Sequence, residues 1–172
     1  MEQPLELNKA VEFHGHLCPG LVIGYRAALM AMWELGITRA QDEELVATVY
    51  TDSCAVDAVQ VLTGCTFGKG NLRFRDLGKH VFLFARQGSG QWLRLALRHD
   101  GWGQAGDRVK LVRTLLRLPE SSLFSVRQVP MEPSRPANIF ATIECAFCGE
   151  GVMEPRARVR EGKYACLECA EA

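Results

Sequence analysis

The sequence of 172 residues lacks a net charge and a bilayer-length apolar run, and its first residues do not predict a signal peptide. Its 20 basic and 20 acidic side chains cancel, so no overall field attracts nucleic acid, anionic lipid or an acidic partner. The longest apolar stretch, residues 21–35, contains Arg26 and Glu34 and is too short to span a bilayer. Residues 1–11 are acidic and have no apolar segment of signal-peptide length. We therefore expect a cytoplasmic protein without a membrane partner, and nucleic-acid binding is disfavoured.

Cysteine is the residue type that the sequence has in unusual supply. Seven cysteines is an odd number, and four of them form two Cys-x-x-Cys pairs. A reducing compartment uses such pairs for metal or redox chemistry rather than for a disulfide framework. With 48% hydrophobic residues, the chain can form one ordinary core and a small appendage. We expect a core domain over residues 1–134 and a second, small domain over residues 135–172.

Apolar periodicity and turn residues predict the elements of the core domain. Residues 19–35 are expected to form a buried helix with proline at its start and Gly36 at its end. Its small residues would let another backbone approach closely. The other expected elements are a strand at 45–50, a helix before Gly64 capped by Asp52 and Ser53, a glycine-rich loop leading into a strand at 66–74, a hairpin at 81–98, a loop at 99–106, an amphipathic helix at 107–118, a strand at 124–129 and a proline-rich spacer at 130–136. This order favours an α+β fold with a mixed or antiparallel sheet packed with helices.

The C-terminal segment contains the pattern of a four-cysteine zinc site. Cys145, Cys148, Cys166 and Cys169 form two pairs at the spacing of structural zinc ligands. Gly149 follows the first pair, where glycine lets backbone amides point at the thiolates. Four thiolates leave no open coordination position on Zn²⁺, so the ion would be structural and would supply most of the folding free energy of the segment. Two redox dithiols are the alternative interpretation.

The segment FHGHLCPG, residues 13–20, predicts a second site. In an extended segment His14, His16 and Cys18 would point to one side. Cys18 and Cys54 each lie at an expected helix start, where free N–H groups favour a thiolate, and the two thiols could meet at one end of the sheet. Histidines bonded to the backbone are the alternative for His14 and His16. Cys65 lies about 16 Å along the helix from Cys54, so it would either complete a site across a dimer or lie in the core.

Three parts of the sequence together resemble the E-subunit family of formylmethanofuran dehydrogenase over nearly the whole chain. They are FHGHLCPGLVIGYRAA, DSCAVDAVQVLTGCTFGKGNL and the two late cysteine pairs. The resemblance implies an α+β core, a homodimer and a C-terminal treble-clef zinc finger. The residues that match the site of the family are His16, Cys18 and Cys54, with His14, Asp52, Cys65 and the loop Lys69 to Asn71 as weaker matches.

We weigh three functions against this sequence. The first is a metal-binding accessory or metal-handling subunit, with a molybdenum or tungsten oxidoreductase as partner. The second is a metal- or thiol-dependent enzyme that uses His16, Cys18 and Cys54 as catalytic residues or ligands of a second metal ion. The third is a regulatory module that binds nucleic acid or protein through the finger, against which the neutral charge argues. We favour the first.

Overall fold

The computed structural model describes residues 4–99, 107–130 and 139–172. The predicted loop after His99 and the predicted spacer after Pro130 lie outside these ranges. The chain divides into two compact units, Met1–Ser134 and Arg135–Ala172, and each is described by itself. In the described ranges, no helix has both the length and the apolar character that crossing a bilayer requires.

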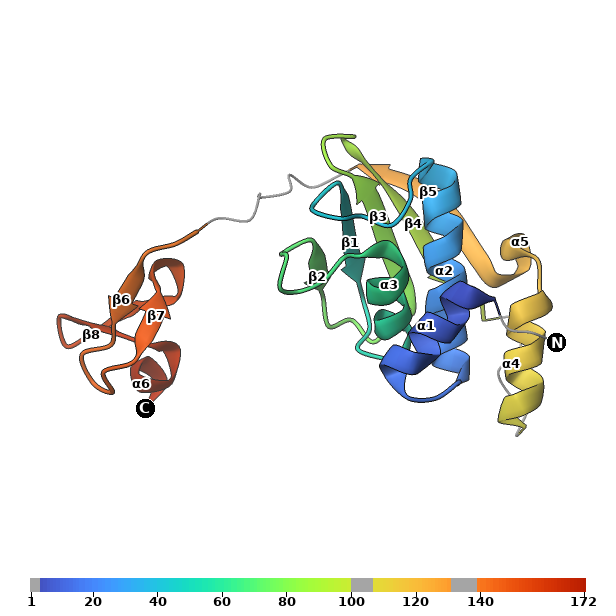
Figure 1. Ribbon diagram of the computed structural model, residues 1–172. Helices are drawn as coiled ribbons and strands as arrows, with labels where there is room; N and C mark the ends of the chain where they lie inside the picture. Colours follow the sequence, from blue (N-terminus) through green and yellow to red (C-terminus); the bar gives the residue numbers. More distant parts are fainter. Residues whose placement is uncertain (1–3, 100–106, 131–138) are drawn as a thin grey trace. The chain divides into compact units, whose positions relative to one another are not determined.

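A five-stranded mixed sheet forms the centre of the first unit (Figure 1). Strands β1 and β2 are parallel, and β1, β3, β4 and β5 pair antiparallel. The order across the sheet is β2 (Leu72–Phe74), β1 (Leu45–Val49), β3 (Val81–Arg86), β4 (Gln91–Leu97) and β5 (Phe124–Pro130). The predicted α+β fold with a mixed sheet is therefore confirmed.

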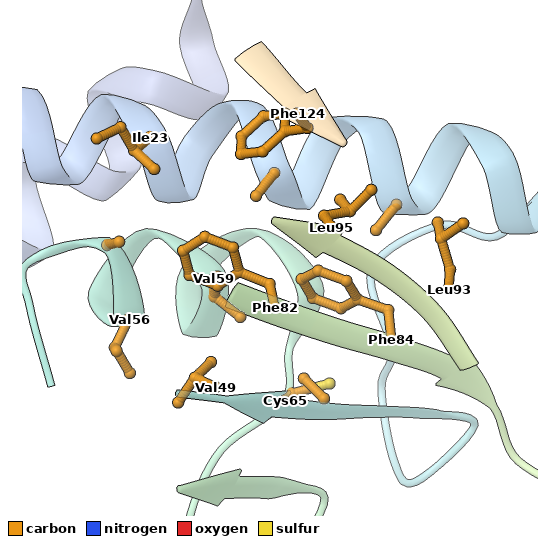
Figure 2. Close-up of a cluster of buried hydrophobic side chains, with 14 of the residues drawn as sticks. Ile23, Val49, Val56, Val59, Cys65, Phe82, Phe84, Leu93, Leu95 and Phe124 are labelled. Atoms are coloured by element: carbon orange, nitrogen blue, oxygen red, sulfur yellow. The ribbon is translucent and has the colours of Figure 1, made fainter. Parts of the chain in front are cut away.

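One face of the sheet carries the main core. Alternate strand residues such as Val49, Phe82 and Leu95 pack with Ile23 and Val59 from two helices (Figure 2). Strand side chains alternate between faces, so Val46, Leu83 and Trp92 form a smaller apolar cluster on the opposite face. The helices of this unit are α1 (Leu5–His14), α2 (Pro19–Leu35), α3 (Ala55–Thr63), α4 (Arg108–Arg117) and α5 (Glu120–Leu123).

Helices α2 and α3 touch at the backbone level. A Cβ atom at Gly24 would overlap the carbonyl group of Ala55, and one at Gly20 would lie 3.2 Å from the Cβ atom of Cys54. The prediction that small residues on the helix at 19–35 admit another backbone is confirmed at these positions. This contact brings the first turns of α2 and α3 together.

The helix boundaries agree with the glycine signals but not with the predicted cap. Gly36 and Gly64 end α2 and α3 in the left-handed region, at φ 59° and 75°. The prediction that Asp52 and Ser53 cap α3 is wrong: no side-chain cap hydrogen bond is present at its start, and the N–H of Ser53 donates instead to Thr51 Oγ1. The backbone carbonyl of Ser53, rather than a side chain, accepts the N–H of Val56 in the first turn.

Helix α1, like the short helix α5, is an element that the sequence patterns did not predict. It ends at His14, and Gly15 then turns the chain at φ 94° with its N–H donated to the carbonyl of Val11. The prediction of an extended segment through His14, His16 and Cys18 is therefore wrong. A helix end and a turn, rather than strand alternation, determine where these side chains lie.

The second unit consists of two short hairpins and a terminal helix. The elements are β6 (Thr142–Glu144), β7 (Gly151–Met153), a 3₁₀ turn at Glu154–Arg156, β8 (Arg158–Arg160), β9 (Lys163–Ala165) and α6 (Leu167–Glu171). Glu161 and Gly162, both at positive φ, connect β8 to β9. A hairpin with a cysteine knuckle, a second hairpin and a helix make up a treble-clef-like module.

Candidate metal centres

The four cysteines of the second unit converge on one point. The sulfur atoms of Cys145, Cys148, Cys166 and Cys169 all lie within 4.8 Å of one another. Four sulfur ligands at about 2.3 Å from a tetrahedral ion lie about 3.8 Å from one another, and Cys148 Sγ lies 3.9 Å from Cys166 Sγ, so the arrangement fits a single tetrahedral ion. The knuckle after Cys148 turns at Gly149, which has φ 78°. This cluster can hold a metal such as zinc.

Backbone N–H groups of the second unit donate hydrogen bonds to the cysteine sulfur atoms and so stabilise thiolates. The N–H of Cys166 donates to Cys145 Sγ at 3.3 Å, and the N–H of Cys169 donates to Cys166 Sγ at 3.4 Å. Backbone hydrogen bonds, first from Cys166 and then from Cys148, lower the pKa of Cys145 to about 6. A side-chain hydrogen bond with Cys166, followed by burial and hydrogen bonds with the other thiols, raises the pKa of Cys169 to about 12. The thiolate of Cys145 is thus favoured even without a cation, whereas four thiolates together require a bound cation.

A second cluster, the His/Cys cluster of His14, His16 and Cys18, lies in the first unit, where α1 meets α2. The side-chain donor atoms of His14, His16 and Cys18 lie within 4.8 Å of one another, and the two imidazole rings have centroids 4.5 Å apart. Cys18 is the N-cap residue of α2, and its sulfur accepts the N–H of Leu21 at 3.4 Å. The three predicted residues are therefore brought together. Mixed imidazole and thiolate donors suit zinc and other soft ions.

Asp57 orients His14 and was not among the predicted site residues. His14 Nδ1 lies 2.7 Å from Asp57 Oδ2, while its Nε2 lies 3.9 Å from Cys18 Sγ. A neutral imidazole that donates Nδ1–H to a carboxylate leaves the Nε2 lone pair free for an ion. The available signal was spacing: Asp57 lies three residues after Cys54, on the same face of a helix.

Cys54 lies against Cys18, as the sequence predicted, but its thiol is not acidified. Burial, followed by a side-chain hydrogen bond with Cys18, raises the pKa of Cys54. The prediction of a low pKa from the helix start is therefore wrong for this thiol, because the half-buried position outweighs the dipole of a short helix. A cation nearby would favour deprotonation of Cys54.

Cys65 and the glycine-rich loop lie at the other end of β1. The Cys65 thiol is fully buried, donates to the carbonyl of Leu45 at 3.3 Å and is surrounded by core side chains (Figure 2). Asn71 donates to the same carbonyl, and Lys69 donates to backbone carbonyls at Gln41 and Asp42. Cys54 follows the opposite end of this strand. Within one chain, the structure does not bring these residues to the His/Cys cluster.

Asp52 and the two further histidines, His80 and His99, lie beside the His/Cys cluster or outside it. Asp52 is exposed, on the turn that precedes Cys54. His80 Nε2 lies 3.3 Å from Ser53 Oγ, next to Cys54, and burial lowers the pKa of this imidazole. His99 is exposed at the end of the described range.

The buried Cys65 thiol predicts a loss of stability at alkaline pH. Burial raises its pKa from 9.0 to about 11, so the unfolded chain ionises first. The stabilisation is complete below pH 9 and is lost as the pH rises toward 11, by about 3 kcal/mol at most. Urea unfolding of the reduced protein at pH 8 and pH 10.5 measures this loss, and Cys65→Ala should show a shallower pH dependence. Equal slopes for both proteins would contradict the prediction.

Known proteins resemble this chain in both structure and sequence. A crystal structure of a tungsten formylmethanofuran dehydrogenase E-subunit (FmdE)-like protein from Syntrophus aciditrophicus has a TM-score of 0.72 and 22% identity, over 95% of this chain and 89% of that one. A curated relative from Archaeoglobus fulgidus, named "Probable S-adenosyl-L-methionine-binding protein", is 31% identical over 95% of this chain. The chain spans about half the length of that relative, 52%.

The family match covers the residues that build the His/Cys cluster of the first unit. The family described as "FmdE, Molybdenum formylmethanofuran dehydrogenase operon" matches residues 13–125, which is more than half of the chain. This range includes His14, His16, Cys18, Cys54 and Asp57, and the resemblance seen in the sequence is confirmed. The chain belongs to the FmdE family.

Proposed function

We propose that this FmdE protein is a metal-handling accessory subunit, with a structural zinc ion in the second unit and a second ion at the His/Cys cluster. The observation that carries the proposal is the chain of contacts from Asp57 through His14 to Cys18. A carboxylate that fixes the tautomer of an imidazole is characteristic of metal ligation. The family description supports a molybdenum or tungsten oxidoreductase as the partner.

The exposure of the cluster supports transfer of the ion. His16 is exposed, whereas Cys18 and Cys54 are half-buried. An ion held there would be accessible from solvent on the histidine side, which a donor or acceptor protein needs. In this arrangement His16 meets the incoming partner, and His14 stays fixed by Asp57.

Catalysis is the second candidate function, and the same exposure favours it. A bound zinc-like ion would supply Lewis acidity beside an accessible face, while Asp57 holds His14 in one tautomer. Turnover by the isolated protein that is lost in Cys18→Ser would favour this function over the accessory role.

Metal analysis of the purified protein tests the proposal. Two equivalents per chain are expected, with one lost in Cys18→Ser and the other lost in Cys166→Ser. Transfer of the cluster ion to an apo molybdenum or tungsten oxidoreductase is expected from wild type and not from Cys18→Ser. A single equivalent that is lost only in Cys166→Ser would refute the core site. The homodimer stays a prediction, which light scattering of the same protein tests.

Replacing Asp57 by asparagine should weaken binding at the cluster without unfolding the protein. The amide lacks the charge that holds Nδ1–H of His14, so we expect metal affinity to fall about 10–100-fold. Chelator competition measures the affinity, and circular dichroism checks the fold. Asp76→Asn is the matched control, because Asp76 is exposed on the loop between β2 and β3 and is not among the residues that match the site of the family. Unchanged affinity in Asp57→Asn would remove the orienting role.

A further inference from the structure

The sheet face opposite α2 and α3 is unusually basic for a protein without net charge. Strand alternation places Thr48, Leu83 and Arg94 on this face, away from the core. The strand register aligns one row of side chains across all five strands. From β2 to β5, the row is Arg73, Thr48, Leu83, Arg94 and Arg127.

A pocket of about 320 Å³ lies on this face. Its polar lining includes Arg73, Arg75 and Arg94 together with Thr48 and Tyr50, and none of the described residues that line it is acidic. Its floor is apolar, with Trp92 buried to 4% exposure. Three guanidinium groups therefore border one small cavity without a carboxylate in its lining.

The guanidinium groups at the pocket are available for a ligand. Arg73 and Arg94 are half-buried, yet neither makes a hydrogen bond or ion pair with any residue that the structure describes. Arg75 lies over the ring of Tyr50, 5.4 Å from its centroid. Elsewhere in the same unit the buried Arg26 has its guanidinium bonded to two carbonyls and to Glu120. The pocket arginines lack such partners.

Thr48 provides an independent sign of a missing partner. Its side chain lies in the pocket lining between Arg73 and Leu83, and the residue is only 7% exposed. Within the described ranges its hydroxyl has no hydrogen-bond partner. A buried hydroxyl without a partner destabilises the folded protein, and a bound acceptor would remove this penalty.

A second copy of the chain is a poor occupant for this face. A two-fold interface with its axis through this pocket would bring the arginines of both copies together. Like charges in a desolvated contact repel each other and disfavour such an interface. A small anion fits the positive charge of the arginines, the unpaired Thr48 hydroxyl and the size of the cavity.

We propose that this pocket binds a small phosphorylated molecule through its phosphoryl group. Guanidinium groups match phosphate oxygens in planar, bidentate geometry, and the Thr48 hydroxyl adds a donor in the pocket lining. The volume is at the low end of small-molecule pockets, so the ligand is compact. The pocket lies on the sheet face opposite the core helices, so its ligand binds independently of the His/Cys cluster.

Calorimetric titration of the full chain at low salt tests the proposal, with inorganic phosphate, pyrophosphate and citrate as probes. Saturable binding of pyrophosphate or phosphate is expected, with citrate weaker. The double variant R73Q/R94Q should weaken binding at least tenfold, because each bond to a charged group is worth about one decade or more. R108Q is the matched control, since Arg108 is an exposed arginine on α4. The core metal content should be the same in all three proteins.

Four outcomes would overturn the proposal. The first is no binding of phosphate or pyrophosphate at millimolar concentration, and the second is equal binding by wild type and R73Q/R94Q. The third is tighter binding of citrate than of pyrophosphate. The fourth is a dimer, seen by light scattering, that dissociates in R73Q/R94Q and that anions neither stabilise nor weaken. The last outcome would assign this face to a second copy.

Discussion

A Cys166→Ser variant is expected to lose the folded state of the second unit while the first unit stays folded. Only Cys145 and Ala165 are buried hydrophobic residues in its described part, 139–172, so burial contributes little. A unit of about 40 residues with so small a core depends on a metal or disulfides. Structural zinc supplies about 10–16 kcal/mol of apparent binding free energy in comparable modules. Loss of one of four ligands should remove most of it.

Limited proteolysis, NMR dispersion and zinc content measure this loss. We expect rapid cleavage within residues 139–172, collapsed amide dispersion for that segment and one fewer zinc equivalent. Cys18→Ser is the matched control, because it removes a thiol from the first unit and should leave the second unit protected. A second unit that stays folded and protease-resistant in Cys166→Ser, or in wild type after zinc chelation, would contradict the metal-dependent fold.

Local sequence signals predicted the elements whose ends are set by glycine or proline. Proline at the start and Gly36 at the end defined α2, and alternation with a short turn defined the β3–β4 hairpin. Helix α1 escaped because its residues, LELNKAVEFH, mix apolar and charged side chains with no capping residue before them. Its packing against α2 and α3 through Leu7 and Ala10 provides the stabilisation that its local helix propensity lacks.

The site was predictable in its residue types and not in its geometry. His14, His16 and Cys18 were singled out by their density in eight residues, but a strand was assumed where a helix ends and turns. Asp57 was missed because its contact with His14 joins residues 43 apart in the sequence. The arginine pocket depends on the register of separate strands, and single-strand patterns do not contain that information.

Replacing Gly24 by alanine is expected to separate α2 from α3 and thereby to weaken the His/Cys cluster. The new methyl group would overlap the backbone carbonyl of Ala55, which has no flexible end to move aside. Alanine raises helix propensity by about 1 kcal/mol, whereas overpacking against backbone costs about 3 kcal/mol or more. The clash therefore exceeds the gain, and urea unfolding should show a net loss of about 2 kcal/mol or more.

The glycines of the first unit offer a graded series for this prediction. Gly20→Ala should have a smaller effect, because its Cβ atom would lie 3.2 Å from the Cβ atom of Cys54. Gly68→Ala is the control for the substitution itself, since nothing lies within 4 Å of its Cβ position. Because Cys18 precedes α2 and Cys54 precedes α3, core metal affinity should fall in the same order as stability, Gly24→Ala most and Gly68→Ala least. A Gly24→Ala protein with wild-type stability and metal affinity would show that the close approach of these helices does not hold the two thiols together.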